Sequence, residues 1–150
     1  MLKFRGASNL SLDAKGRVVL PARYREVLSE VCNSQLVVTI DIDQPCLLIY
    51  PLNEWEIVEQ KINALPGGVN KAVRRIQRKL IGYATDIEVN ESGRLLLTAP
   101  LRNYAKLEKK VVLIGQGNKF ELWDEQLWEK LCMEEDAEED IPAALAELSL

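Results

Sequence analysis

Hydrophobic and polar residues alternate with a period of two along several short stretches of this chain. In residues 36–43 the side chains of Val38, Ile40 and Ile42 fall on one face and polar side chains fall on the other. This alternation predicts a half-buried strand. From similar runs and the turn residues around them, we expect further short strands at 4–12, 18–20, 46–50, 82–89, 95–97 and 110–114.

Apolar residues recur at helical spacing in other stretches. Residues 53–65 place Trp55, Ile62 and Leu65 on one face, and Asn53 is the expected N-cap of this helix. The other predicted helices are 22–31, which follows Pro21, then 70–80 and 99–107.

Most of one stretch of the chain occurs twice. Residues 10–25 return as residues 87–102 at a constant offset of 77, and residues 50–56 return as 123–129 at an offset of 73. The loss of four positions is placed most simply in the connection at 31–35, because loops tolerate such changes in length. The chain therefore contains an internal repeat.

Each copy of the repeat carries a polar turn between two apolar runs, at 13–17 and at 90–94. The glycine of each turn can take the positive φ that closes a short hairpin. The first residue of each turn can accept a backbone N–H bond through its side chain. The turn-forming residues are Asp13, Gly16, Asn90 and Gly93.

The repeat suggests a domain organisation. We assign residues 1–65 to the first repeat with its helix, 66–81 to a connecting basic helix, 82–133 to the second repeat and 134–150 to an acidic tail. Either half alone would leave strand edges and an apolar face exposed. We therefore expect an α+β fold with a mainly β core, a closed or interlocked small β-barrel with pseudo-two-fold symmetry, and peripheral helices.

The net charge of −4 averages two unlike regions. Residues 134–150 hold seven acidic residues and no basic one, so the remaining 16 acids stand against 19 Lys and Arg and give residues 1–133 a charge of +3. The helix expected at 70–80 also carries a basic stripe, which is either a solvated face or a surface for phosphates or a neighbouring subunit's acids. The stripe consists of Arg74, Arg75, Arg78 and Lys79.

Composition argues against an enzyme or a metalloprotein. The chain has no histidine, and Cys32, Cys46 and Cys132 fit neither a disulfide framework nor a zinc pattern, so we expect buried free thiols. Asp41 and Asp43 on one strand face are interpreted as a solvated side rather than a cation site. We expect no catalytic residue, cofactor, metal or small-molecule substrate.

No apolar run approaches the roughly 20 residues that cross a bilayer. We accordingly expect a cytoplasmic protein with no membrane partner.

Several short motifs together resemble the MraZ family. They are the opening Phe4-Arg-Gly, the two Asp/Asn-x-x-Gly-Arg turns, Leu20-Pro-Ala-Arg-Tyr-Arg25, Cys46-Leu-Leu-Ile-Tyr-Pro-Leu-Asn-Glu-Trp55 and Asn118-Lys-Phe-Glu-Leu-Trp-Asp124. The resemblance covers nearly the whole chain and is weakest in the acidic tail. It implies two AbrB-like swapped-hairpin units in one chain.

The resemblance also implies a function. It points to a bacterial transcriptional regulator that is associated with the nucleoid and assembles into homo-oligomeric rings. Such a regulator acts on double-stranded promoter DNA of the division and cell-wall gene cluster. We interpret this action as repression. The DNA-contacting signature of the family is an Asp-x-x-x-Arg turn in each half. Asp13 and Arg17 match it, whereas Asn90 stands before Arg94 where Asp is usual.

Basic residues near the turns are therefore the candidate DNA contacts. A guanidinium can bind phosphate with two hydrogen bonds or bind the guanine edge in the major groove. We expect the first turn to bind DNA more strongly than the second. Lys15 adds a positive charge to the first turn, whereas its counterpart in the second turn is the neutral Ser92. The candidates are Lys15, Arg17 and Arg94, followed by Arg5, Arg23, Arg25 and Arg102.

Two other functions stay open at this point. The chain could be an antitoxin of AbrB type, or a ring-forming assembly protein that does not bind DNA. Trp55, Trp123 and Trp128 are expected to serve core or subunit packing rather than base stacking. The acidic tail could mimic DNA or simply be solvated.

Overall fold

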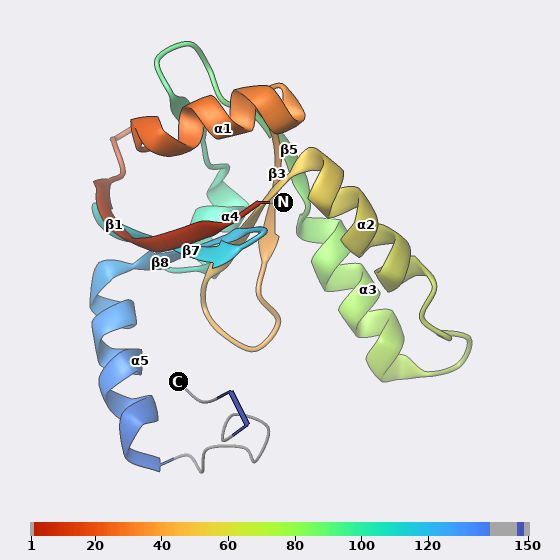
Figure 1. Cartoon of the computed structure of the whole chain (residues 1–150). Helices are drawn as coiled ribbons and strands as arrows, with labels where there is room; N and C mark the ends of the chain where they lie inside the picture. The colour runs from red at the N-terminus through yellow and green to blue at the C-terminus, as the bar shows by residue number, and fades with distance from the viewer. Residues whose placement is uncertain (1, 139–146, 149–150) are drawn as a thin grey trace.

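Strands and helices alternate along the chain in a computed structural model that describes residues 2–138, 147 and 148 (Figure 1). The strands are β1 (Phe4–Ser11), β2 (Arg17–Val19), β3 (Gln35–Ile40), β4 (Leu47–Pro51), β5 (Thr85–Glu88), β6 (Arg94–Leu96), β7 (Lys110–Gly117) and β8 (Phe120–Asp124). The helices are α1 (Ala22–Cys32), α2 (Leu52–Asn63), α3 (Lys71–Tyr83), α4 (Ala99–Tyr104) and α5 (Glu125–Glu138).

The strands form one antiparallel six-stranded sheet in the order β1-β7-β8-β4-β3-β5 and a separate antiparallel pair, β2-β6. The repeat relates β1 to β5, β7 to β3 and β8 to β4, so the order of the large sheet reads the same from either edge. The first strand of each half pairs with a strand of the other half. The two repeats are therefore interleaved, and the predicted α+β class is confirmed.

The prediction of a closed or interlocked barrel is met in part: the two halves interlock, no closed barrel forms in the part of the chain that the structure describes, and the swapped-hairpin arrangement stays a prediction. Strands β1 and β5 lie at opposite edges of the large sheet, and β2 and β6 pair only with each other. The β2-β6 pair lies between those two edges, with β2 against β1 and β6 against β5, but among the described residues it forms no strand ladder with either edge.

The main core lies between the large sheet and the β2-β6 pair. Phe4 stacks on Phe120 with ring centroids 4.2 Å apart, and Tyr24 meets Phe120 edge-on at 4.8 Å. Leu20 and Leu97, at equivalent positions in the two repeats, are fully buried in the same cluster. Because both halves contribute to this core, neither can bury its apolar side chains without the other.

The helices flank the sheet on three sides (Figure 1). Helix α1 crosses one end of the sheet, α2 and α3 lie side by side on one flank, and α5 extends from the opposite side. The offset of 73 relates α2 to α5, whereas α3 has no counterpart among the described elements. Trp55 of α2 and Trp123 of β8 are buried, and the half-buried Trp128 of α5 packs against the cluster around Trp123, which agrees with the predicted packing role of all three.

Several predicted boundaries are corrected. The strand expected to reach residue 43 ends at Ile40, because Asp41 accepts the N–H of Asp43 at 2.9 Å and forms a turn. Helix α2 begins at Leu52 after Pro51, so Asn53 lies inside its first turn and is not the cap. Leu65 lies beyond the end of this helix and is exposed.

Two further boundaries concern the regions around the second repeat. Asn70 caps α3 by accepting the N–H groups of Ala72 and Val73, and the helix continues to Tyr83, so the strand expected from residue 82 starts only at Thr85. Helix α5 continues to Glu138, so the acidic region begins as helix. Residues 139–146, 149 and 150 of the acidic tail lie outside the described residues.

Candidate nucleic-acid interface

The first turn is held by hydrogen bonds to one carboxylate. Asp13 Oδ1 accepts the backbone N–H of Lys15 at 2.9 Å and of Arg17 at 2.8 Å. The N–H of Gly16 donates to the Asp13 carbonyl at 3.0 Å, and Gly16 adopts φ +84°. The turn therefore has a defined shape, with Lys15 exposed at its tip.

Arg17 is oriented by the same carboxylate. Its Nε donates to Asp13 Oδ2 at 2.8 Å, and both side chains are about one-third exposed. The backbone N–H of Arg17, together with this ion pair, lowers the pKa of the Asp13 carboxyl below its usual value of 3.8. This bond uses only Nε, so within the described part of the chain the two terminal NH₂ groups of Arg17 remain as donors for a ligand.

The second turn has the same backbone and a different charge. Asn90 Oδ1 accepts the N–H of Arg94 at 2.9 Å, and the N–H of Gly93 donates to the Asn90 carbonyl at 2.9 Å, with Gly93 at φ +76°. The neutral amide keeps the turn-forming bond but offers no ion pair. The Arg94 side chain is exposed and forms no ion pair within the described part of the chain.

The two turns are joined at the centre of the molecule. The N–H of Leu20 donates to the Gly93 carbonyl at 2.9 Å, and the N–H of Leu97 donates to the Gly16 carbonyl at 2.8 Å. Strands β2 and β6 pair directly between these bonds. The turns thus lie at opposite ends of one short ribbon, and their relative position is set by the pairing.

Arg25 and Arg102 pack behind the turns rather than at their tips. A Cβ atom on Gly16 would lie 2.9 Å from Arg102 Nε, and one on Gly93 would lie 2.6 Å from Arg25 Nε. Arg102 Nε donates to the Leu97 carbonyl at 3.1 Å, whereas Arg25 Nε is buried and has no hydrogen-bond partner among the described residues. Each arginine therefore supports the turn of the opposite half. Sequence reasoning missed this contact, although the offset of 77 relates the two pairs.

Arg23 and Arg5 lie to one side of this ribbon. Arg23 Nη2 donates to Ser8 Oγ at 3.0 Å and to the Tyr24 hydroxyl at 2.9 Å, and its guanidinium lies over the Tyr24 ring. The Tyr24 hydroxyl in turn donates to the Arg5 carbonyl at 2.6 Å. Arg5, Arg23 and Tyr24 line a surface hollow of about 360 Å³ with Leu2 and neighbouring side chains. The structure brings Lys15, Arg17 and Arg94 to the turns and places Arg5 and Arg23 apart from them.

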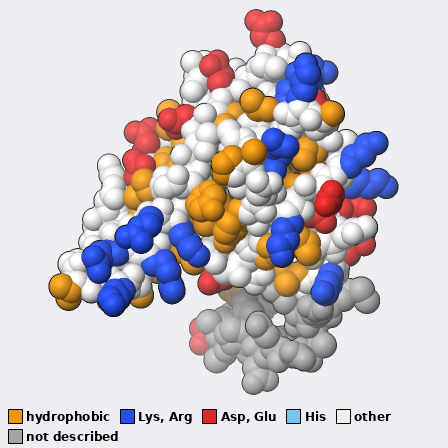
Figure 2. Space-filling model, turned by 180° about the vertical axis from the view of Figure 1, so that it is seen from behind, with side chains coloured by type: hydrophobic (Ala, Val, Ile, Leu, Met, Phe, Trp, Pro, Cys, Tyr) orange, Lys and Arg blue, Asp and Glu red, His pale blue; other side chains and the backbone are white. Residues whose placement is uncertain are grey.

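A second basic surface lies on α3. Figure 2 shows Lys and Arg side chains gathered at the lower left, over the end of the molecule formed by α2 and α3. None of these side chains forms an ion pair within residues 2–138. The surface, which we call the α3 basic face, comprises Lys71, Arg74, Arg75, Arg78 and Lys79.

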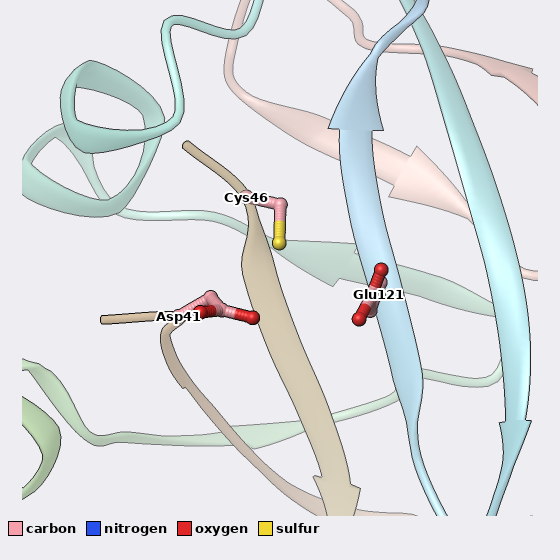
Figure 3. A group of neighbouring side chains, drawn as sticks. All are labelled: Asp41, Cys46 and Glu121. Carbon is pink, nitrogen blue, oxygen red and sulfur yellow. The ribbon is translucent and has the colours of Figure 1, made fainter. Parts of the chain in front are cut away.

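Asp41, Cys46 and Glu121 form a compact polar cluster (Figure 3). Their side-chain oxygen and sulfur atoms lie within 4.8 Å of one another, and Asp43 is not part of the group. Burial, with the nearby charges of Glu121 and Asp41, raises the pKa of the Cys46 thiol. Glu121 already accepts the Trp123 indole N–H at 2.9 Å, so the cluster is a set of internal contacts.

No helix in the described part of the chain is long and apolar enough to cross a membrane. The fold and the paired turns define a class of α+β protein in which two interleaved repeats present two related turns on one ribbon. The chain belongs to the MraZ family. The family model, described as MraZ protein and antitoxin-like, matches residues 3–79 and again residues 80–149.

Relatives of similar length support the assignment. A protein of Idiomarina loihiensis is 55% identical over 91% of this chain and 90% of its own length. A protein of Psychromonas ingrahamii is 52% identical over 94% of this chain and 91% of its own length. One of Serratia proteamaculans is 50% identical over 98% of this chain and 99% of its own length. Each is named transcriptional regulator MraZ. The resemblance seen in the sequence motifs is confirmed.

Proposed function

We propose that this protein is a transcriptional regulator that binds double-stranded promoter DNA through the turns at 13–17 and 90–94. The observation that carries this proposal is the pair of symmetry-related turns, each with a fixed backbone and an arginine, held at the two ends of one ribbon. DNA is a polyanion with local two-fold symmetry. A pair of related cationic turns matches such a ligand better than a single basic patch does.

The chemistry of the turns suits this role. Asp13 fixes the direction of the Arg17 guanidinium, so Arg17 loses less side-chain freedom on binding. The first turn carries Lys15 and Arg17 against one acid, whereas the second carries Arg94 against Glu91. The first turn is the more positive one. It should therefore contribute more of the affinity.

A single chain would bind DNA weakly, because residues 1–133 carry a charge of only +3. An oligomeric ring that presents several pairs of turns to spaced promoter repeats would gain roughly 10² to 10⁴ in avidity. By occupying the promoter of the division and cell-wall gene cluster, such a ring would repress transcription and associate with the nucleoid.

Charge complementarity supports assembly through α3 and α5. Helix α3 contains five basic residues and no acidic one. Residues 125–138, which form α5, contain six acidic residues and one lysine. Helix α3 follows the first repeat and α5 follows the strands of the second, so pairing of α3 of one copy with α5 of another would join two different surfaces and be head-to-tail. Head-to-tail contacts generate rings when the rotation closes.

A mobility-shift experiment tests the DNA-binding proposal. Wild-type protein should shift a duplex that carries the promoter repeats, and Arg17→Ala should weaken the shift by about tenfold, as expected for loss of one charged contact. A Lys61→Ala variant, on the exposed surface of α2 and outside the α3 basic face, provides a control for a lost positive charge elsewhere. Absence of any shift with wild-type protein would contradict the proposal and favour an assembly protein that does not bind DNA.

The antitoxin-like description of the family supports a second candidate, an antitoxin of AbrB type. This candidate predicts that a toxic protein is neutralised by direct binding, in addition to any binding of DNA. Co-expression with the product of each neighbouring gene, scored by growth, separates the two functions. If the Arg17→Ala variant still rescues growth, the antitoxin function is favoured.

A further inference from the structure

The outer face of the β2-β6 ribbon combines exposed aliphatic side chains with arginines. Val19 is 43% exposed and Leu96 is 51% exposed. Their neighbours Val18 and Leu95 are each 1% exposed and point into the core. The alternation therefore directs Val19 and Leu96 away from the protein.

The register places each aliphatic residue opposite an arginine. Arg17 pairs with Leu96, and Val19 pairs with Arg94, around a central Val18–Leu95 pair. Because side chains alternate along a strand, all four outer residues lie on the same face. We call these four residues, Arg17, Val19, Arg94 and Leu96, the ribbon face. It is pseudo-two-fold symmetric about the central pair.

The composition of the ribbon face restricts its partner. The two guanidinium groups on one diagonal of this face call for an anionic ligand, while the two aliphatic groups on the other diagonal gain only from contact with apolar surface. The major groove of B-DNA offers both, because thymine methyl groups lie on its floor between two phosphate backbones. Two strands spaced about 4.8 Å apart form a ribbon that fits a groove about 12 Å wide.

We propose that the ribbon face enters the major groove and that Val19 and Leu96 contact thymine methyl groups. This inference rests on the proposed DNA-binding function and adds base recognition by two residues that the turn motif does not include. It predicts thymines at two positions related by the dyad of the bound site, each beside a base or phosphate held by Arg94 or Arg17. An acidic protein surface with apolar pockets is the alternative partner.

Removal of the thymine methyl groups tests the inference directly. A duplex is first selected from random sequence by wild-type protein and is then synthesised with deoxyuridine in place of thymidine. Fluorescence anisotropy gives the Kd of each duplex for wild type, for the double variant Val19→Ala/Leu96→Ala and for Ile57→Ala. Ile57 is 50% exposed on α2 and provides a matched control outside the ribbon face.

Loss of a buried methyl contact weakens binding about fourfold, so wild type should bind the uridine duplex roughly tenfold more weakly. The double variant should bind the thymidine duplex about tenfold more weakly than wild type and should not distinguish the two duplexes. Ile57→Ala should behave as wild type.

Two results would overturn the inference while leaving DNA binding intact. One is equal binding of both duplexes by wild type, and the other is a double variant that still prefers thymidine. Failure of wild type to bind any duplex would overturn the proposed function as well. In that case loss of a captured acidic protein on Val19→Ala/Leu96→Ala would favour the alternative partner.

Discussion

At the scale of single residues, the two turns differ by one functional group. Asp13 and Asn90 accept the same backbone N–H bond at nearly the same distance, so the turn shape does not require a charge. The carboxylate adds the ion pair to Arg17. The difference predicts that the first turn responds to pH and that the second does not.

The pH dependence follows from the lowered pKa of Asp13. A carboxyl whose pKa is lower in the folded state stabilises the protein above its unfolded pKa, and the stabilisation is lost as pH falls through the folded value. Asp13→Asn keeps the acceptor oxygen and removes the titration. Thermal unfolding midpoints should therefore differ between wild type and Asp13→Asn above about pH 4 and converge below it. A difference that stays constant from pH 3 to pH 7 would contradict this account.

The glycine of the second turn is predicted to be required for packing as well as for its positive φ. Gly93→Ala should destabilise the protein by about 2–3 kcal/mol in denaturant unfolding, because the new Cβ would meet Arg25 in addition to the strained backbone. Gly68→Ala has a positive φ and open space around it, so it should cost only about 1 kcal/mol. Equal effects of the two substitutions would show that the Arg25 contact does not matter.

At the scale of elements, α3 shows how tertiary contacts move a boundary. Leu80, Ile81 and Ala84 pack on the cluster around Trp55, and the buried Thr39 hydroxyl donates to the Leu80 carbonyl at 2.6 Å. These contacts hold the helix through Gly82, where the sequence pattern predicts a strand. Long-range contacts of this kind leave no periodic signal in the local sequence.

The Thr39 hydrogen bond gives an element-scale prediction. Thr39→Val keeps the shape of the side chain and removes the donor, and it should lower the free energy of unfolding by about 1 kcal/mol. Thr85→Val provides a control, because Thr85 donates only to the carbonyl of Tyr83, two residues away. Greater amide exchange near Leu80 in Thr39→Val alone would locate the effect at the end of α3. No change in stability would contradict it.

The repeat made much of the fold predictable from the sequence. The offset of 77 identified both turns, and the structure gives them the same hydrogen-bonded backbone. The α+β class and most elements followed from local patterns. Barrel closure could not be judged from patterns, because it depends on strand lengths and edges in space. The support of Gly93 by Arg25 and the cluster of Asp41 with Glu121 join segments far apart in the sequence, so no spacing revealed them.

At the scale of the whole molecule, opposite charges on α3 and α5 predict head-to-tail assembly. Arg74→Glu/Arg75→Glu reverses part of the α3 basic face, and Glu125→Lys/Glu129→Lys reverses part of α5. Each variant alone should approach the 17.0 kDa mass of one chain in light scattering. Mixing the two variants restores complementary contacts and should restore a large assembly. Unchanged masses in both variants would contradict assembly through these helices.

The central claim is that DNA is bound by two unequal turns on one ribbon. The most direct measurement is the salt dependence of promoter-duplex affinity for wild type, Arg17→Ala and Arg94→Ala. Both variants should bind more weakly, Arg17→Ala more so, and each should reduce the slope of log K against log salt by about one if its arginine contacts a phosphate. The account would be contradicted if neither substitution changed the affinity for DNA. It would also be contradicted if Arg94→Ala lost more affinity than Arg17→Ala.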